Sequence, residues 1–329
     1  MKAGDLSSKA FSAHRVIFDR IAAMSENRDL AHKSGFVAVV GRPNVGKSTL
    51  INALLGQKVA AVSPKPQTTR RNQLGILTLD EAQIIFTDTP GLHHERNKLG
   101  ELMNTEALSA LEDADVVLLV ADASESPRDE DTALAEQIAA RKSGTPTLIA
   151  LNKTDLVDSL QLETRHREFG ELIPGADILA VSAATGAGLD SLRERLIELL
   201  PSGPPFFPED QVTDLYERQI AADLIREAAL NHLRDEVPHG IAVRIDQFVE
   251  RESGGALIEA TLLVEKETHK GIVIGQGGEM VKQIGTDARK EIERMSGRKV
   301  FLQLRVKVRK DWRDDEDVLR RFGYGKKST

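Results

Sequence analysis

The sequence combines a length of 329 residues with 40% hydrophobic residues, no cysteine and a formal net charge of −7. This length suffices for two domains, and the apolar content gives each of them a core, so a disordered chain is not expected. No window approaches eighteen consecutive apolar residues, so we expect a soluble protein without a membrane-spanning helix. The absence of cysteine excludes disulfides, thiolate zinc sites and a cysteine nucleophile, and it fits a reducing cytoplasm.

The charge is unevenly distributed along the chain. Residues 282–310 contain ten lysines and arginines against three acidic residues, a local charge of +7, which leaves −14 for the rest. An acidic protein argues against a nucleic-acid partner, but a single basic patch does not. Such a run is most often a solvated face, so its position in the fold has to decide between the two interpretations.

Residues 1–34 are expected to form a polar N-terminal extension. They contain no apolar stretch of signal-peptide length, and Asp5, Asp19 and Glu26 fit poorly with an organelle transit peptide. We expect residues 1–23 to be a dispensable extension or a misassigned start, with a short amphipathic helix around residues 11–21.

Short apolar runs alternate with longer stretches of helical period between residues 35 and 200. The runs begin at Phe36, Ile84, Val116, Thr147 and Ile178. This alternation predicts an α/β domain over 35–200, with a mostly parallel sheet flanked by helices. Four prolines in LPSGPPFFPED (200–210) then exclude a continuing helix, so we place an inter-domain linker at residues 201–213.

Residues 214–329 follow a different pattern, which predicts an α+β domain. Apolar positions in 215–234 repeat every four residues and indicate a helix with one buried stripe. Two strands are expected near 241–245 and 257–265, then a glycine loop, a helix that Gly297 caps, and a last strand, KVFLQLRVKV. The expected order is therefore helix, strand, strand, glycine loop, helix, strand.

Residues 41–48 (GRPNVGKS) match the P-loop pattern and lie between a predicted strand and a predicted helix. Glycines let such a loop curl so that its N–H groups point at phosphate oxygens, while Lys47 reaches the β and γ phosphates and Ser48 ligates Mg²⁺. A plain turn is a poor alternative, because the four fixed positions would arise by chance in about one in a hundred chains of this length. The expected phosphate-site residues are Gly41, Arg42, Pro43, Asn44, Val45, Gly46, Lys47, Ser48 and Thr49.

The motif DTPG follows the predicted strand at residues 84–87. Its residues, together with the next one, are Asp88, Thr89, Pro90, Gly91 and Leu92. The carboxylate can hold Mg²⁺ through a water, and the Gly91 N–H can meet the γ-phosphate.

Two further motifs choose between ATP and GTP. They are NKTD (Asn152, Lys153, Thr154 and Asp155) and the pair Ser182 and Ala183. Asp155 offers two acceptors to the N1–H and exocyclic amine of guanine, Asn152 is expected to face N7 and O6, and the Lys153 stem covers the ring. The Ser182–Ala183 pair can place a backbone N–H near O6. Each motif alone is weak or moderate, but in this order, at the ends of predicted parallel strands, they predict a GTP site and disfavour an ATP-dependent enzyme.

These motifs resemble the signature set of translation-factor-class GTPases. The resemblance implies that a threonine of QTTRR (67–71) closes over Mg²⁺, and we expect Thr69 rather than Thr68 in this role. Leu92 stands where Ras-type enzymes keep a water-positioning glutamine, so hydrolysis should be slow, or use another group or a partner. Asn44 resembles the residue of members that recruit K⁺, which is a further hypothesis. The expected metal ligands are Ser48, Thr69 and Asp88, and the expected catalytic residues are Lys47, Thr69, Asp88 and Gly91.

The second glycine stretch, GIVIGQGGEMVK (271–282), cannot be another P-loop, because no Lys-Ser or Lys-Thr pair follows it and Glu279 would repel a phosphate. It fits the loop of a KH module, whose glycines admit a sugar-phosphate backbone, and the element order is that of the bacterial-type KH fold. The basic segment occupies the helix and strand that should wall the RNA groove, which favours RNA binding over a solvated face. The expected RNA contacts are Lys270, Ile274, Gly275, Gln276, Gly277, Gly278, Lys282, Arg289, Lys290, Arg305 and Lys307.

A GTPase domain followed by such a KH domain resembles the Era family. The segments that carry the resemblance are GRPNVGKST, QTTR, DTPGL, NKTD, SAATG, FPED and IGQGG. It implies a GTP-switched, Mg²⁺-dependent assembly factor for the small ribosomal subunit, whose KH domain grips the single-stranded 3′ end of the small-subunit ribosomal RNA. It also implies a cytoplasmic monomer with some peripheral membrane association. A non-hydrolysing RNA chaperone with a structural nucleotide stays open as an alternative, which Leu92 supports.

Overall fold

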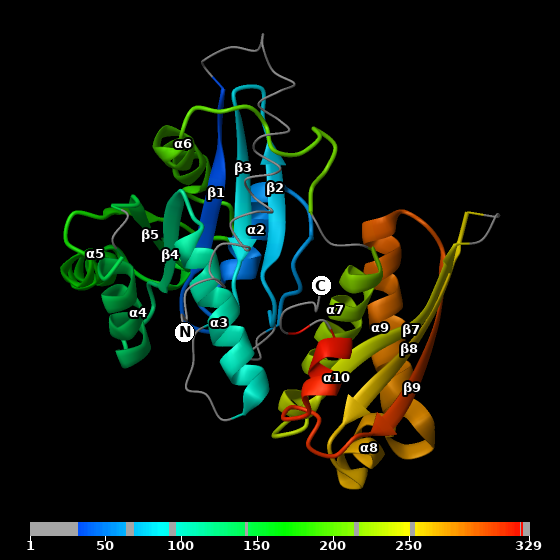
Figure 1. Ribbon diagram of the computed structural model, residues 1–329. Coiled ribbons are helices and arrows are strands. Elements are labelled where there is room, and N and C mark those ends of the chain that lie inside the picture. Colours follow the sequence, from blue (N-terminus) through cyan, green and yellow to red (C-terminus); the bar gives the residue numbers. More distant parts are fainter. Residues whose placement is uncertain are drawn as a thin grey trace, which may run out of the picture.

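A computed structural model describes residues 32–63, 69–91, 97–141, 144–213, 217–250 and 254–322 together with Tyr324. The helix expected around residues 11–21 lies outside the described residues, as do Thr68 and Leu92. The chain forms two layered units, one around a six-stranded sheet and the other around a three-stranded sheet (Figure 1). The predicted combination of an α/β and an α+β fold is confirmed.

The six-stranded sheet belongs to the first unit, which we call the G unit. Its strands are β1 (Lys33–Val40), β2 (Gln73–Thr78), β3 (Ala82–Asp88), β4 (Val116–Asp122), β5 (Thr147–Asn152) and β6 (Asp177–Ala180). Their spatial order is β2-β3-β1-β4-β5-β6, and only β2 runs antiparallel to its neighbour. Strands β3 and β4 are buried along their whole length, as continuous apolar runs predict for a sheet covered on both faces.

Helices cover both faces of this sheet. They are α2 (Lys47–Leu55), α3 (Lys98–Glu112), α4 (Asp129–Ala139), α5 (Ser159–Leu172) and α6 (Leu189–Leu199). Leu50 of α2 and Leu196 of α6 share one apolar cluster, and Leu134 of α4 and Phe169 of α5 share the cluster on the opposite face. The carboxyl ends of the parallel strands therefore meet at one edge, where an open α/β sheet binds ligands.

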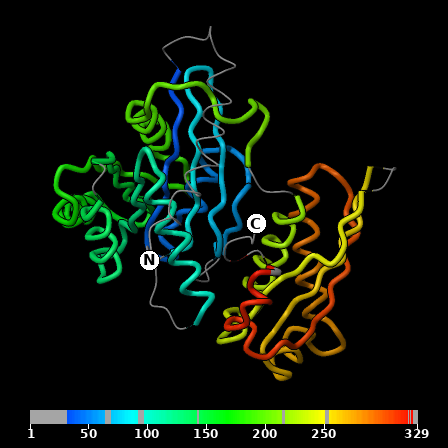
Figure 2. The backbone as a smooth tube through the Cα atoms, in the orientation of Figure 1, coloured from blue at the N-terminus to red at the C-terminus, as the bar shows by residue number. Residues whose placement is uncertain are grey.

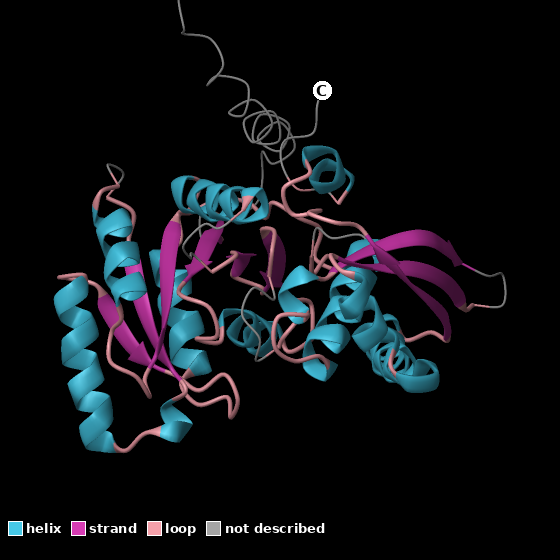
Figure 3. Ribbon diagram, turned by 90° about the horizontal axis from the view of Figure 1, so that it is seen from below, coloured by secondary structure: helices cyan, strands magenta, loops and turns pink. Residues whose placement is uncertain are grey.

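The three-stranded sheet belongs to the second unit, which we call the KH unit. Its elements are α7 (Glu217–His232), the 3₁₀ turn η2 (Pro238–Gly240), β7 (Ala242–Glu250), β8 (Ala256–Val264), α8 (Glu267–Ile274), α9 (Glu279–Ser296), β9 (Val300–Val308) and α10 (Glu316–Arg321). Strand β8 pairs antiparallel with β7 and parallel with β9, and α7 and α9 cover one face of the sheet (Figure 3). The predicted element order is confirmed, with α8 before the glycine loop and α10 after β9 as additional elements. None of the helices described here is long and apolar enough to span a bilayer.

The predicted linker is bound to the G unit. Ser34 donates its N–H to the Pro201 carbonyl at 3.1 Å, and Ile76 donates its N–H to the Val212 carbonyl at 2.9 Å. Between these points, the Gln83 side chain accepts hydrogen bonds from the N–H groups of residues 206 and 207. Figure 2 shows the path from α6 past β2 toward α7. The segment is therefore anchored along the sheet edge and is not a free spacer.

The two units also touch directly. An apolar cluster joins Leu99 and Met103 of α3 to Ala242 of β7, Leu263 of β8 and the fully buried Trp312. The outer face of the KH sheet is thus covered at one end by the G unit and by the segment that follows β9.

Candidate nucleotide site and nucleic-acid surface

The P-loop is closely packed around its two glycines. A Cβ on Gly41 (φ 150°) would lie 2.4 Å from the Val120 carbonyl oxygen, and one on Gly46 (φ 101°) would lie 2.3 Å from Asn152 Nδ2. Gly46 caps α2 without a side-chain hydrogen bond, and the first turn of this helix contains no acidic residue. Its free N–H groups and positive dipole end therefore suit a phosphate.

The side chain of Lys47 is held over the P-loop, where it is expected to bind phosphate. Its Nζ donates to the carbonyls of Gly41 at 2.8 Å and Arg42 at 3.0 Å. Burial lowers the pKa of Lys47 to about 8, although the nearby Asp88 acts in the opposite direction. A bound phosphate would favour the charged form of Lys47, which burial disfavours.

The three predicted metal ligands come together. Ser48 Oγ donates to Asp88 Oδ2 at 2.7 Å, Thr69 Oγ1 donates to the same oxygen at 3.0 Å, and the two hydroxyls lie 3.1 Å apart. The other carboxylate oxygen of Asp88 is buried and has no hydrogen-bond partner among the described residues. Hard oxygen ligands of this kind fit Mg²⁺, which binds through one carboxylate, hydroxyls, waters and substrate phosphates.

A cavity of about 230 Å³ opens over these groups. Its lining includes the P-loop residues Pro43, Asn44, Gly46, Lys47, Ser48 and Thr49, with Thr69, Thr89, Gly91 and Lys153. Gly91 lies so close to Pro43 that a Cβ there would come within 3.0 Å of it. The cavity also contains Ala61, Val62 and Ser63, which the sequence analysis missed because no motif marks them.

The loops expected to bind the base are linked to the P-loop. Asn152 Nδ2 donates to the Val45 carbonyl at 2.9 Å, and Asn152 Oδ1 accepts the N–H of Ala183 at 3.0 Å. These bonds give Asn152 a positioning role between the two loops, and its second amide N–H leaves the expected contact with the guanine edge as a prediction. Asp155 is exposed and accepts a hydrogen bond from Ser182 Oγ at 2.5 Å. Its other oxygen has no partner in the described part of the chain and can face a guanine edge.

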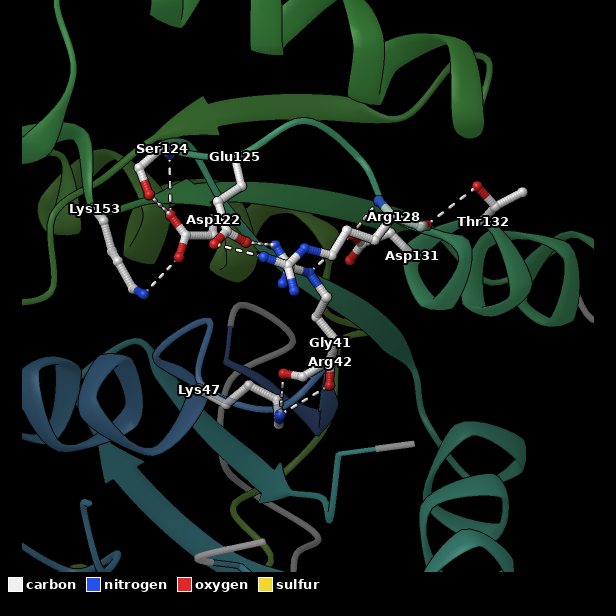
Figure 4. A network of polar contacts seen from close by, with 10 residues as sticks. All are labelled: Gly41, Arg42, Lys47, Asp122, Ser124, Glu125, Arg128, Asp131, Thr132 and Lys153. Carbon is white, nitrogen blue, oxygen red and sulfur yellow. Dashed lines mark hydrogen bonds and ion pairs between the residues drawn. The ribbon is translucent and has the colours of Figure 1, made fainter. Parts of the chain in front are cut away.

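Figure 4 shows that the side chain of Arg42 runs from the P-loop to α4, away from Lys47. It contacts Asp131 Oδ2 at 2.9 Å and Glu125 Oε2 at 2.6 Å. Burial lowers the pKa of Arg42, but the bonds and charges of these carboxylates outweigh it and raise the pKa overall. Arg42 thus anchors the loop, and only its backbone is placed for phosphate. In the same view, Lys153 Nζ contacts Asp122 at 2.5 Å, which holds the lysine stem beside the base site.

The second glycine loop has one closed and one open side. A Cβ on Gly275 (φ 74°) would lie 2.7 Å from Met280 Cβ, so only glycine fits there. Gly277 (φ 60°) and Gly278 (φ 84°) have no atom within 4 Å of the position that a Cβ would occupy. The loop is therefore packed against α9 and leaves open space for an RNA backbone. Ile274 and Lys270 lie on α8 directly before it, and Gln276 is exposed.

The predicted basic contacts divide over several faces. Gly285 of α9 faces Leu304 of β9, because a Cβ added to this glycine would lie 3.4 Å from the Leu304 side chain. Lys282 and Arg289 lie three positions before and four after it, on the same helix face. Lys290 instead lies 4.0 Å from Asp287, whose carboxylate contacts His232 of α7.

Arg305 and Lys307 lie on the opposite face of the KH sheet. Strand β9 turns its aliphatic residues toward the helices, and Arg305 pairs with Glu259 of β8 at 3.0 Å on the outer face. The expectation that both residues wall the groove with α9 is therefore corrected, because side chains of a strand alternate between its faces.

The fold and the two glycine sites define a P-loop GTPase joined to a KH domain. Two family models agree: residues 36–153 match the one described as a 50S ribosome-binding GTPase, and residues 236–313 match the KH domain. GTPase Era of Caldicellulosiruptor saccharolyticus is 46% identical over 304 residues, which are 91% of this chain and 100% of that protein. GTPase Era of Geobacter metallireducens is 45% identical over 302 residues, 92% of this chain and 100% of the relative. The chain belongs to the Era family of GTPases.

Solved structures agree with this assignment. Era in complex with MgGDPNP and nucleotides 1506–1542 of 16S ribosomal RNA matches with a TM-score of 0.85 and 41% identity, over 89% of this chain and 99% of that one. An Aquifex aeolicus Era variant bound to GDP·AlF₄⁻ matches with the same TM-score, identity and coverage.

Proposed function

We propose that this chain hydrolyses GTP and that the bound nucleotide controls RNA binding by the KH unit. The observation that carries this proposal is the cluster of Ser48, Thr69 and Asp88 oxygens beside the P-loop. Such a cluster makes the position of Thr69 depend on a metal and a γ-phosphate, which is how GTPase switch segments sense their nucleotide.

Each nucleotide-site residue has a role in this proposal. Lys47 exchanges its two carbonyl partners for the β and γ phosphates, the N–H groups at the start of α2 and of Gly91 donate to phosphate oxygens, and Asp155 selects guanine. Mg²⁺ would be held by Ser48, Thr69 and Asp88, where it neutralises charge on the phosphates, as the MgGDPNP in the related Era structure suggests.

The group that orients the attacking water is a separate question. A leucine cannot orient water, and Leu92 lies outside the described residues. Asn44 is exposed and lines the cavity, and we propose it as a K⁺ site that supplies the missing charge. Equal turnover in sodium and potassium salts would exclude this role.

We propose the 3′ end of the small-subunit ribosomal RNA as the partner of the KH unit. A relative with 41% identity was solved with nucleotides 1506–1542 of 16S ribosomal RNA, and the open glycine loop here leads into α9, which carries Lys282 and Arg289 on one face. The expected biological role is small-subunit assembly by a cytoplasmic monomer. A weak peripheral contact with the membrane is part of the same family expectation.

We also propose that the chain divides into functional segments. These are an extension at 1–34, the GTPase domain at 35–200, the linker at 201–213 and the KH domain at 214–329. The separate apolar clusters of the two units support this division.

A single-turnover assay tests the proposal. The full chain in excess over GTP, with and without a 3′-terminal fragment of the small-subunit RNA, should form GDP and phosphate, and the rate should change with RNA. GTP that binds and is not cleaved in either condition would favour the alternative of an RNA chaperone with a structural nucleotide. Crosslinking to cellular RNA, compared between the natural chain and a Gly277 variant, tests the partner and its site together.

A further inference from the structure

Arg70, the residue after the metal-site threonine, is buried in the KH unit. Only 5% of it is exposed. Its Nη1 donates to the Ile241 carbonyl at 2.9 Å and its Nη2 to the His239 carbonyl at 3.1 Å, where η2 leads into β7. The guanidinium also lies 5.7 Å from the ring centroid of Trp312. Thr69 and Arg70 thus point to different units: the hydroxyl contacts the P-loop cluster and the guanidinium contacts the KH unit.

Residues 58–63, which precede Thr69 in the chain, are attached to the KH unit as well. Lys58 contacts Glu227 of α7 at 2.6 Å and Glu291 of α9 at 3.2 Å. The Val62 N–H donates to the other Glu227 oxygen at 3.1 Å. Val62 also lines the nucleotide cavity. Residues 58–63 and 69–71, which we call the clamp, are therefore held between the two units.

The charges around Arg70 make this arrangement sensitive to displacement. A buried guanidinium is stable only while its hydrogen-bond partners surround it, because the cost of its desolvation is otherwise uncompensated. Burial is the largest influence on Arg70 and lowers its pKa, while a hydrogen bond from Arg70 to Tyr324 and the carboxylate of Asp223 favour the charged form and Arg313 opposes it. If Thr69 leaves the metal cluster and carries the backbone with it, Arg70 loses its two carbonyls and the face of Trp312.

The linker offers a poorer route between the units. It is hydrogen-bonded to the G unit near both of its ends, through the carbonyls of Pro201 and Val212. Between these points, the N–H groups of residues 206 and 207 donate to the Gln83 side chain. A change at the phosphate site therefore reaches the KH unit over a shorter distance through the clamp.

We infer that Arg70 is a positioning residue of the GTPase reaction: by its bonds to the KH unit it holds Thr69 at the Ser48–Asp88 cluster. This inference rests on the proposed function of the nucleotide site. The KH unit therefore helps to hold the catalytic site in its ordered conformation. Because coupling between two sites is reciprocal, an RNA that shifts the docking of the KH unit changes the affinity for GTP by the same factor as GTP changes the affinity for that RNA.

Trp312 provides the measurement, since it is the only tryptophan of the chain and lies at the Arg70 contact. In the full chain, exchange of GDP for a non-hydrolysable GTP analogue should change Trp312 emission. In Arg70→Gln, this nucleotide-dependent change should be lost, and the affinity for the GTP analogue and kcat should each fall about tenfold, within the range of coupling between sites. The affinity for GDP should stay within twofold, since Thr69 acts at the metal and the γ-phosphate. Arg70→Lys, which keeps one donor group, should recover part of kcat.

Arg195→Gln is the matched control, because Arg195 is paired only with Asp177 and Glu198 of the G unit in the described part of the chain. It should behave as the natural chain. Should Arg70→Gln fail to fold, Lys58→Gln breaks the other end of the clamp at a side chain that is 22% exposed, and it should reduce kcat in the same direction. A folded Arg70→Gln with natural kcat and a natural emission change would overturn the inference. Absence of hydrolysis by the natural chain would instead contradict the proposed function.

Discussion

The P-loop and the KH loop are glycine loops that both open helices, and they differ in what surrounds them. In the P-loop, added Cβ atoms on Gly41 and Gly46 would lie within 2.4 Å of protein atoms, and the following helix begins without an acidic residue. In the KH loop, Gly277 and Gly278 face open space, and the following helix begins with Glu279.

The difference separates two ways of binding phosphate. An enclosed loop with a free helix N-terminus suits a compact, highly charged group that the loop surrounds. An open loop beside an acidic helix start cannot bind several phosphates of one group in this way. An RNA strand can pass over it, because its backbone brings one phosphate at a time to the loop. Glycine is used for enclosure in the first loop and for access in the second.

Lys47→Ala should have the largest effect, and it should act on nucleotide binding by the enclosed P-loop. The loss of a charged donor to two phosphates should weaken GDP binding at least about a hundredfold, as measured by calorimetry. RNA binding by the same variant, measured in the absence of nucleotide, should stay within a few-fold of the natural chain. Loss of both activities in folded protein would show that the two loops do not act as separate sites.

Gly277→Asp should weaken RNA binding by the open KH loop. The position has room for a side chain and a φ of 60°, which aspartate tolerates, so the added charge is the main change. Repulsion of the RNA backbone should weaken RNA binding about tenfold or more, as measured by fluorescence anisotropy. Gly277→Asn is the matched control, because it adds the same volume without charge and should retain most of the affinity. GTP hydrolysis without RNA should be unchanged in both variants.

Local pattern explains why so much of the fold and site could be predicted. The P-loop, DTPG, NKTD and the KH loop are each contained in a few consecutive residues, and alternation along β9 already separates the face of Leu304 from that of Arg305. The missed features join distant residues. Arg42 contacts Asp131, Asn152 contacts Val45, and Arg70 contacts Ile241, contacts that no local spacing encodes.

The pKa of Lys47 gives a smaller and graded effect on the enclosed loop. Burial lowers this pKa to about 8 in the free protein, and bound phosphate favours the protonated form, so binding takes up a proton above pH 8. The Kd for GDP should therefore rise about twofold from pH 7 to 8 and then steepen toward about tenfold per pH unit. Calorimetry in buffers of different ionisation enthalpy would measure the proton uptake directly. A Kd that is flat through pH 9 would show that Lys47 stays protonated without phosphate.

The smallest effect should separate the two faces of the KH sheet. Lys282 lies on the α9 face that meets Leu304, whereas Arg305 is paired with Glu259 on the outer face. Lys282→Gln should weaken RNA binding several-fold and reduce the salt dependence of log K by about one phosphate contact. Arg305→Gln removes the same formal charge and should change the affinity less than twofold. If the two variants weaken RNA binding equally, the RNA also crosses the outer face of the sheet, and the open loop is then one contact point of a longer track.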